Sequence, residues 1–158
     1  MICSVVALFV DEQEAQIREV LSKVPIDCIQ FHGDETAEAC RIYGRRYIKA
    51  IAIREGIDIS ALANNYHDAT GLLLDTFDPN AKGGTGNQFN WNLIPKQLNL
   101  PIILAGGLDE SNAKQAVQTV RPYALDVSSG VEAKKGIKDS LKMAAFIKQV
   151  NEGDRVTT

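Results

Sequence analysis

Strand-like and helix-like patterns alternate along the whole chain, and this alternation restricts the fold more than any other feature. Six apolar runs are expected to form strands, at residues 4–10, 27–32, 47–53, 70–75, 101–105 and 123–128. Helices are predicted after them, ending near Val24 and then over residues 35–43, 59–66, 91–98, 109–120 and 139–150. Regular alternation is typical of parallel strands joined by crossover helices. We therefore predict an α/β fold, with residues 1–150 as one domain and 151–158 as a polar tail.

Polar residues and glycines mark the expected helix ends. Asp11 with Glu14 three residues later has the spacing of a capping box. Asp109 is expected to cap a later helix, and Gly44 suits the position just after a helix. These positions support the predicted boundaries.

The composition excludes several classes of function. The chain has 158 residues, a net charge of −3, and no stripe of Lys and Arg, which argues against nucleic acid as a partner. No apolar run is long enough to span a bilayer, so a cytoplasmic protein without a membrane partner is expected. The three cysteines, Cys3, Cys28 and Cys40, do not have the spacing of metal ligands. We expect reduced, mostly buried thiols and no metal.

The last two predicted strands both end in small residues. Gly106 and Gly107 follow one strand, and Ser129 and Gly130 follow the other. In α/β barrels, the loops after the last two strands commonly bind phosphate, because glycines let backbone N–H groups approach an anion. Plain tight turns are the alternative. The first strand is followed by Asp11 rather than by a phosphate loop, which favours a barrel over a doubly wound sheet.

Asp75 ends a strand that reads as buried on both faces. Three leucines, residues 72–74, precede it. The C-terminal end of such a strand is where α/β barrels hold their catalytic groups. The loop that follows contains Gly83, Gly84 and Gly86 and is long for its type, so closure over a substrate and simple exposure to solvent both remain open.

Several motifs, taken together and in order, resemble the phosphoribosylanthranilate isomerase family. They cover almost the whole chain and lie at residues 6–10, 30–35, 74–76, 83–91, 104–112 and 125–139. The resemblance implies a (β/α)8 TIM barrel and an Amadori rearrangement of phosphoribosylanthranilate in tryptophan biosynthesis. It also implies Asp75 as the general acid that opens the sugar ring, and neither a metal nor an organic cofactor. An apolar strand would favour the protonated acid by desolvation.

The chain departs from the family at its beginning. The family's general base is a cysteine in a Lys-Ile-Cys-Gly motif after its first strand, and Cys3 does not match that position. At about 3.3 Å per residue, Cys3 lies roughly 20 Å short of the catalytic rim. We therefore expect an N-terminally truncated barrel of about six βα units, weak or absent turnover, and open sheet edges that pair with another copy.

Further residues are candidates for substrate contacts. His32 is expected either to contact the substrate or to be a hydrogen-bonded structural residue. Asp126 could orient the anthranilate or sugar, or form an internal salt bridge, and Lys49 could pair with Asp75 or Asp126. Gly84 is a candidate in the long loop. Two alternative functions remain: a non-catalytic remnant that binds a phosphorylated ligand, and another phosphate-binding barrel enzyme.

Overall fold

Six parallel strands form one sheet in the computed structural model, which describes residues 4–54, 56–76 and 90–155. Each strand lies beside its neighbours in the chain, so the order in the sheet is the order in the sequence. The strands are β1 (Val6–Phe9), β2 (Cys28–Phe31), β3 (Arg46–Ile53), β4 (Gly71–Thr76), β5 (Ile102–Leu104) and β6 (Ala124–Leu125). The predicted α/β fold with parallel strands is confirmed.

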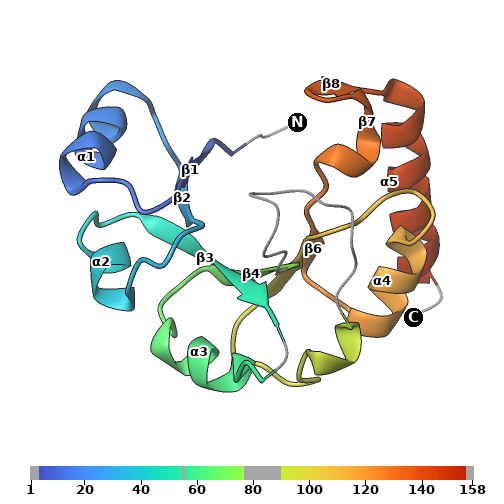
Figure 1. The fold of residues 1–158 in the computed structure, drawn as a ribbon, viewed down its shortest axis with the longest axis horizontal. Coiled ribbons are helices and arrows are strands. Elements are labelled where there is room, and N and C mark those ends of the chain that lie inside the picture. The colour runs from blue at the N-terminus through green and yellow to red at the C-terminus, as the bar shows by residue number, and fades with distance from the viewer. Residues whose placement is uncertain (1–3, 55, 77–89, 156–158) are drawn as a thin grey trace.

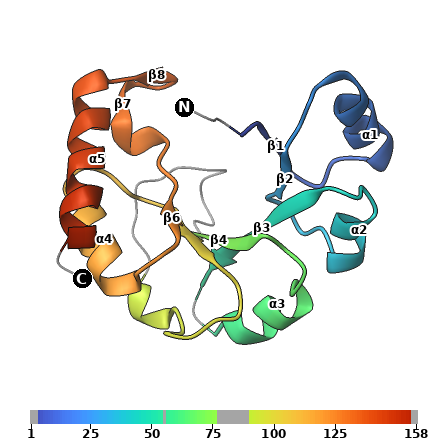
Figure 2. The ribbon, with the colours of Figure 1, turned by 180° about the vertical axis from the view of Figure 1, so that it is seen from behind.

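The helices lie along the outer side of the curved sheet (Figures 1 and 2). They are α1 (Glu14–Lys23), α2 (Ala37–Arg41), α3 (Ile59–Asn65), α4 (Ala113–Val120) and α5 (Ser140–Arg155), with the short 3-10 turns η1 (Trp91–Leu93) and η2 (Ser129–Val131). One-sided coverage follows from the sequential strand order, because each crossover has the same right-handed sense.

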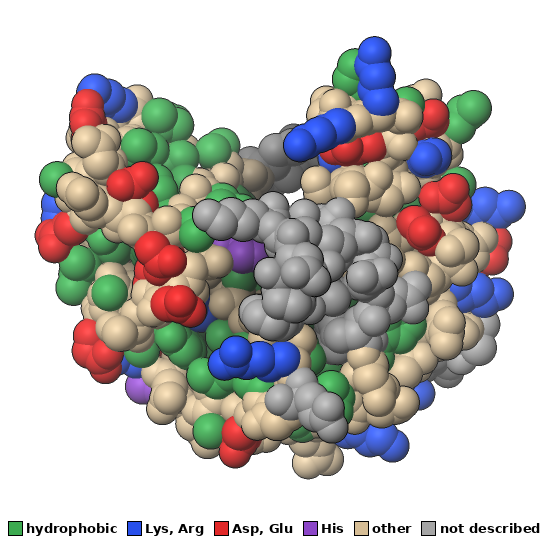
Figure 3. Space-filling view, in the orientation of Figure 1, with side chains coloured by type: hydrophobic (Ala, Val, Ile, Leu, Met, Phe, Trp, Pro, Cys, Tyr) green, Lys and Arg blue, Asp and Glu red, His purple; other side chains and the backbone are tan. Residues whose placement is uncertain are grey.

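The sheet is open rather than closed. In the described part of the chain, β1 pairs only with β2 and β6 pairs only with β5. Figure 1 shows the two sheet ends separated by a gap, and Figure 3 shows a notch in the molecular surface at the same place. The described residues therefore form an open six-stranded parallel sheet and no closed barrel.

The period-two alternation of the strands divides the core into layers. One face of the central strands packs on the helices and contributes Ile29, Phe31, Ile51, Leu72 and Leu74 to the largest hydrophobic cluster. The other face is concave and holds a smaller cluster, Ala50, Leu73 and Ala105. A further cluster joins β5 to α4 and α5. The concave face thus has fewer buried hydrophobic residues than the face that packs on the helices.

Four local expectations are corrected. The helix predicted over residues 91–98 is only the 3-10 turn η1, because Pro95 lacks an N–H and forces Ile94 into an extended conformation. Asp11 does not cap α1, which begins at Glu14 after Gln13. Asp109 binds the N–H of Ser111 instead of capping α4.

The fourth correction concerns the C-terminal part of the chain. Helix α5 continues to Arg155, where a polar tail was expected from residue 151. An antiparallel hairpin that was not predicted, β7 (Glu132–Lys134) with β8 (Ile137–Lys138), precedes it. Gly153 allows α5 to approach α4 closely, because a Cβ there would lie 2.8 Å from the Cβ of Val117.

Candidate active site

Asp75 lies on the concave face at the C-terminal end of β4. Leu72 and Leu74 pack against the helices, so Leu73 and Asp75 face the opposite side by alternation. Asp75 is level with Ala52 on β3. A carboxyl group therefore stands at the edge of the sheet from which all six strands lead into their connecting loops.

His32 reaches Asp75 across the strand that separates them. The backbone N–H of His32 donates to the Phe9 carbonyl (2.8 Å), and its ring Nε2 lies 3.4 Å from Oδ2 of Asp75. The intervening positions on β3 are Ala50 and Ala52, whose small side chains leave room for the imidazole. His32 was predicted to be either a substrate contact or a structural residue. In the structure, its ring lies against the candidate acid, Asp75.

Gln30 completes this row of side chains. Its amide nitrogen lies 3.1 Å from Nδ1 of His32. An amide N–H that donates to Nδ1 leaves the ring proton on Nε2, where it faces Asp75. The row Gln30–His32–Asp75 can therefore hold the carboxyl group in one orientation.

Asp126 is the second carboxyl group at this edge. It follows β6, and its N–H donates to the Leu104 carbonyl at 2.9 Å. Desolvation by burial and the nearby carboxylate of Asp75 raise the pKa of Asp126, while His32 and Lys138 act in the opposite direction.

The two glycine turns lie side by side. A Cβ on Gly130 would lie 1.9 Å from the carbonyl oxygen of Leu108, so the turn after β6 is pressed against the turn after β5. Gly106 and Gly107 have φ of 80° and 63°, which glycine adopts without strain. Buried Asn112 braces this turn by donating to the Gly107 carbonyl at 2.8 Å.

The sequence predicts a phosphate site at these two turns. Gly106 and Gly107 lie just after β5, and Ser129 and Gly130 begin η2 after β6. The turns also follow strands that are in register with β4, since Ala105 donates to the Leu74 carbonyl at 2.8 Å. The two glycine turns therefore lie at the same edge of the sheet as Asp75 and Asp126.

Lys49 does not join this cluster, and that expectation was wrong. Alternation puts Lys49 on the helix side of β3 with Tyr47 and Ile51. There its Nζ lies 3.0 Å from Oε2 of Glu35, and both side chains are buried. Sequence reasoning missed this pair, although a lysine inside an apolar strand is itself a signal for a buried partner.

The cysteines do not provide a base within the described residues. Cys28 and Cys40 are buried free thiols, as expected. Desolvation raises the pKa of Cys28 and raises that of Cys40 to about 11, so both remain protonated at neutral pH. Cys3 and Gly84, the latter a predicted substrate contact, lie outside the described residues.

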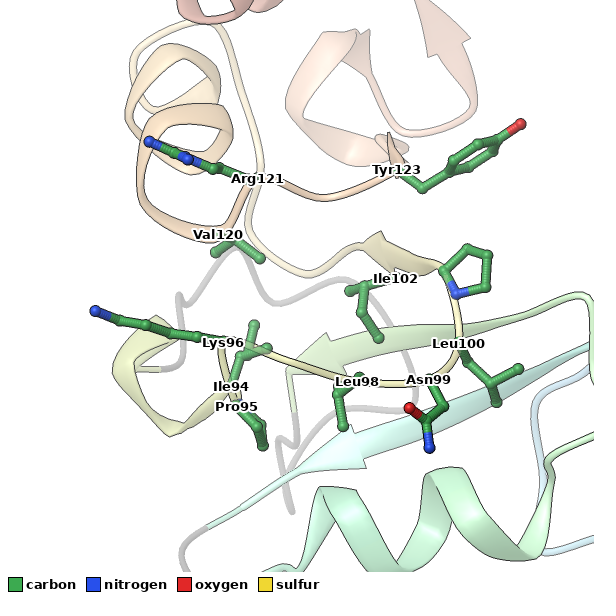
Figure 4. Close-up of a pocket in the computed structure, with 11 residues that line it drawn as sticks. Ile94, Pro95, Lys96, Leu98, Asn99, Leu100, Ile102, Val120, Arg121 and Tyr123 are labelled. Carbon is green, nitrogen blue, oxygen red and sulfur yellow. The ribbon is translucent and has the colours of Figure 1, made fainter. Parts of the chain in front are cut away.

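A hollow of about 440 Å³ lies away from this edge (Figure 4). It is bounded by the segment before β5, the start of β5 and the end of α4, near the N-terminal ends of the strands. Its walls carry Lys96 and Arg121 but no Asp, Glu or His, and Figure 4 shows Arg121 and Tyr123 pointing away from each other. It lacks the carboxyl groups that stand at the concave edge.

None of the described helices is long and apolar enough to cross a membrane. A family model described as N-(5'phosphoribosyl)anthranilate (PRA) isomerase matches residues 2–149. The N-(5'-phosphoribosyl)anthranilate isomerase of Nitrosococcus oceani is 52% identical over 148 residues, which are 94% of this chain and 72% of that protein. A relative of the same name from Pseudomonas putida strain F1 is 50% identical and is covered to 71%.

Solved structures of the same enzyme have the same fold. A monomeric form of the dimeric phosphoribosylanthranilate isomerase from Thermotoga maritima gives a TM-score of 0.81 at 34% identity, covering 96% of this chain and 74% of that one. A phosphoribosyl anthranilate isomerase in complex with reduced 1-(o-carboxyphenylamino)-1-deoxyribulose 5-phosphate gives 0.76 at 36% identity, covering 93% and 71%. The chain belongs to the N-(5'-phosphoribosyl)anthranilate isomerase family.

Proposed function

We propose that this chain supplies the acid and the phosphate site of an isomerase that acts in tryptophan biosynthesis. The reaction converts N-(5-phosphoribosyl)anthranilate to 1-(2-carboxyphenylamino)-1-deoxyribulose 5-phosphate. One observation supports it above the others: Asp75 and the paired glycine turns open onto one edge of one sheet. A single sugar phosphate can therefore contact a proton donor at one end and an anion site at the other.

Asp75 is the general acid in this proposal. It protonates the ring oxygen as the bond from that oxygen to C1 breaks, and the lone pair of the anthranilate nitrogen forms the iminium. Loss of the C2 proton then gives an enolamine, which tautomerises to the ketone. His32, 3.4 Å from Asp75, orients the acid. General acid catalysis of this kind contributes about 10²–10⁴-fold.

The glycine turns bind the phosphate. The N–H groups of Gly106, Gly107, Ser129 and Gly130 meet the oxygens, and the close contact of Gly130 with Leu108 fixes their spacing. Asp126 accepts a hydrogen bond from the substrate's amine or sugar hydroxyl. Its raised pKa is consistent with a site partly withdrawn from water.

We also propose that the sheet is part of a barrel in which two of eight strand–helix units are absent. Support comes from the sequential parallel order, the open edges of β1 and β6, and the 72% of the Nitrosococcus oceani relative that the chain spans. Two more strand–helix units between β6 and β1 would close the sheet. The general base would belong to this completing part, because Cys28 and Cys40 are buried thiols with raised pKa.

Complementation tests the proposal. The chain is mixed with a peptide of the unmatched part of the Nitrosococcus oceani relative, and turnover is followed as loss of phosphoribosylanthranilate fluorescence. We expect activity only in the mixture, and a loss of about 10²–10⁴-fold with Asp75→Asn. Asp68→Asn, on the helix side of the sheet, is the matched control and should retain activity. Full turnover of the Asp75→Asn mixture would refute the acid assignment.

A phosphate-binding remnant is the second candidate. The protonated thiols of Cys28 and Cys40 favour it, because they leave the described residues without a cysteine base, and a site that lacks a base could bind but not isomerise. Binding of the reduced product analogue by the chain, with no turnover after complementation, would select this alternative. In either case we place the protein in the cytoplasm, where buried thiols stay reduced.

A further inference from the structure

A buried ion pair holds the turn that carries His32. Lys49 is 2% exposed and sits on the helix side of β3, where its Nζ lies 3.0 Å from Oε2 of Glu35. The same ammonium group donates to the carbonyl of Gly33. The side chain of Glu35 is also largely enclosed, with an exposure of 8%. Neither group can be reached by a substrate on the concave face.

The two carboxylate oxygens of Glu35 accept hydrogen bonds from two different connecting loops. Oε2 accepts from the N–H of Gly33 at 3.0 Å, and Oε1 accepts from the N–H of Asp11 at 2.8 Å. The pair therefore binds both the N–H and the carbonyl of Gly33, the residue directly after His32. Burial disfavours the charge on Glu35, yet the hydrogen bonds from Asp11 and Lys49 hold its pKa below the usual value.

Neighbouring contacts leave the turn little freedom. Oδ1 of Asp11 accepts from the N–H of Asp34 at 2.6 Å, and a Cβ on Gly33 would lie 2.3 Å from that carboxylate. The hydroxyl of Tyr66, on the outer layer, donates to the carbonyl of Glu35 at 2.9 Å. The loops after β1 and β2 are thus tied to each other and to β3 around a single glutamate.

We propose that Lys49 and Glu35 are positioning residues for the isomerase reaction: they fix the turn at Gly33 so that the imidazole of His32 stays against Asp75. A buried ion pair is seldom a strong source of net stability, because desolvation offsets the attraction, but it fixes geometry. This inference rests on the proposed role of Asp75 and deepens it. It assigns a catalytic consequence to two charges on the opposite face of the sheet.

Imidazole NMR tests the proposal on the chain itself. The sequence has two histidines, so His67, which is exposed, serves as an internal reference for His32. In the unchanged protein we expect His32 as a single Nε2–H tautomer. In Glu35→Gln and in Lys49→Met, the two ring ¹⁵N shifts of His32 should move toward each other as both tautomers become populated, while His67 does not change. This readout needs no turnover, so it is independent of whether the proposed function is correct.

Asp68→Asn is the matched control, because Asp68 forms an ion pair with Arg41 in the same outer layer without touching the turn. It should leave His32 unchanged. In the complemented enzyme, Glu35→Gln should lower kcat about tenfold and alter KM less than about twofold. The proposal is overturned if His32 keeps its shifts in both folded variants, or if Asp68→Asn changes them equally. Failure of both variants to fold where Asp68→Asn folds would also overturn it, by making the pair a folding requirement.

Discussion

At the scale of single residues, Gly130 is packed tightly against backbone. An added Cβ would lie 1.9 Å from the Leu108 carbonyl oxygen, which is backbone and cannot rotate away. We expect Gly130→Ala to lower the free energy of unfolding by about 1–3 kcal/mol and to weaken phosphate binding, since overpacking forces the turns apart. Urea unfolding and titration with inorganic phosphate measure the two effects.

Gly136→Ala separates steric crowding from backbone conformation. Gly136 has φ of 80°, and no described atom lies within 4 Å of the place that an added Cβ would take. Alanine there meets only the left-handed backbone penalty, about 1 kcal/mol. Gly136 lies in the β7–β8 hairpin, so its substitution should not affect phosphate binding. Equal phosphate affinities for both variants would contradict the assignment of Gly130 to the anion site.

The lowered pKa of Asp68 should make the folding stability depend on pH. Hydrogen bonds from Arg41 chiefly, and from Tyr47, lower its pKa from 3.8 to about 2. A depressed folded-state pKa contributes stability that is present above about pH 4 and is lost as the pH falls toward 2. Because the pair is partly exposed, Asp68→Asn should cost only about 1 kcal/mol at pH 6. Thermal unfolding from pH 6 to 2 should show the two proteins converging; a constant difference would contradict this.

The residues of the candidate site were predictable to different degrees. Asp75 and Asp126 could be placed on one edge because both stand at the C-terminal ends of parallel strands in one sheet. The contact between His32 and Asp75 could not, since it depends on sheet curvature and on the small side chains of β3. The error over Lys49 was avoidable: period-two alternation places it with Tyr47 and Ile51, toward the helices.

At the scale of elements, the strands were predicted best, because apolar runs report burial on both faces. Helix ends were predicted less well. Asp11 has φ of 49° and its side chain bonds across to Asp34, a tertiary contact that overrides a local capping pattern. The hairpin of β7 and β8 gave no signal, since its strands are two or three residues long and mostly exposed.

Helix α3 provides a test of local capping. It is seven residues long, and Oδ1 of Asp58 accepts from the N–H of Ala61 at 2.9 Å. A short helix depends strongly on such a cap, so Asp58→Ala should lower stability by about 1 kcal/mol, measured by urea unfolding. Asp58→Asn keeps an oxygen acceptor and should cost only a few tenths. An equal loss in both would show that charge, not the cap, is what matters.

At the scale of the whole molecule, the open sheet exposes apolar side chains that closed sheets bury. Val6, Leu8 and Val10 near the β1 edge are 46%, 55% and 58% exposed, and Figure 3 shows hydrophobic side chains along that wall of the notch. On the opposite side of the gap, Leu141 and Ile147 of α5 are exposed. Unpaired strand edges flanked by apolar surface favour association with another chain.

We therefore predict that the chain self-associates through the β1 edge and that one charge introduced there by substitution weakens this association. We expect sedimentation of the unchanged chain to show a molecular mass that rises with concentration. Leu8→Lys should shift this association to higher concentration with little change in thermal stability, because the side chain is already exposed and lysine on an edge strand opposes pairing.

Leu141→Lys is the matched control, since it adds the same charge to an exposed apolar position on helix α5 rather than on a strand edge. If both substitutions weaken association equally, the apolar surface rather than the strand edge drives it. If the unchanged chain stays monomeric at high concentration, the edge does not drive assembly. Leu8→Lys should also reduce activation by the complementing peptide, because the same edge would receive the added strand.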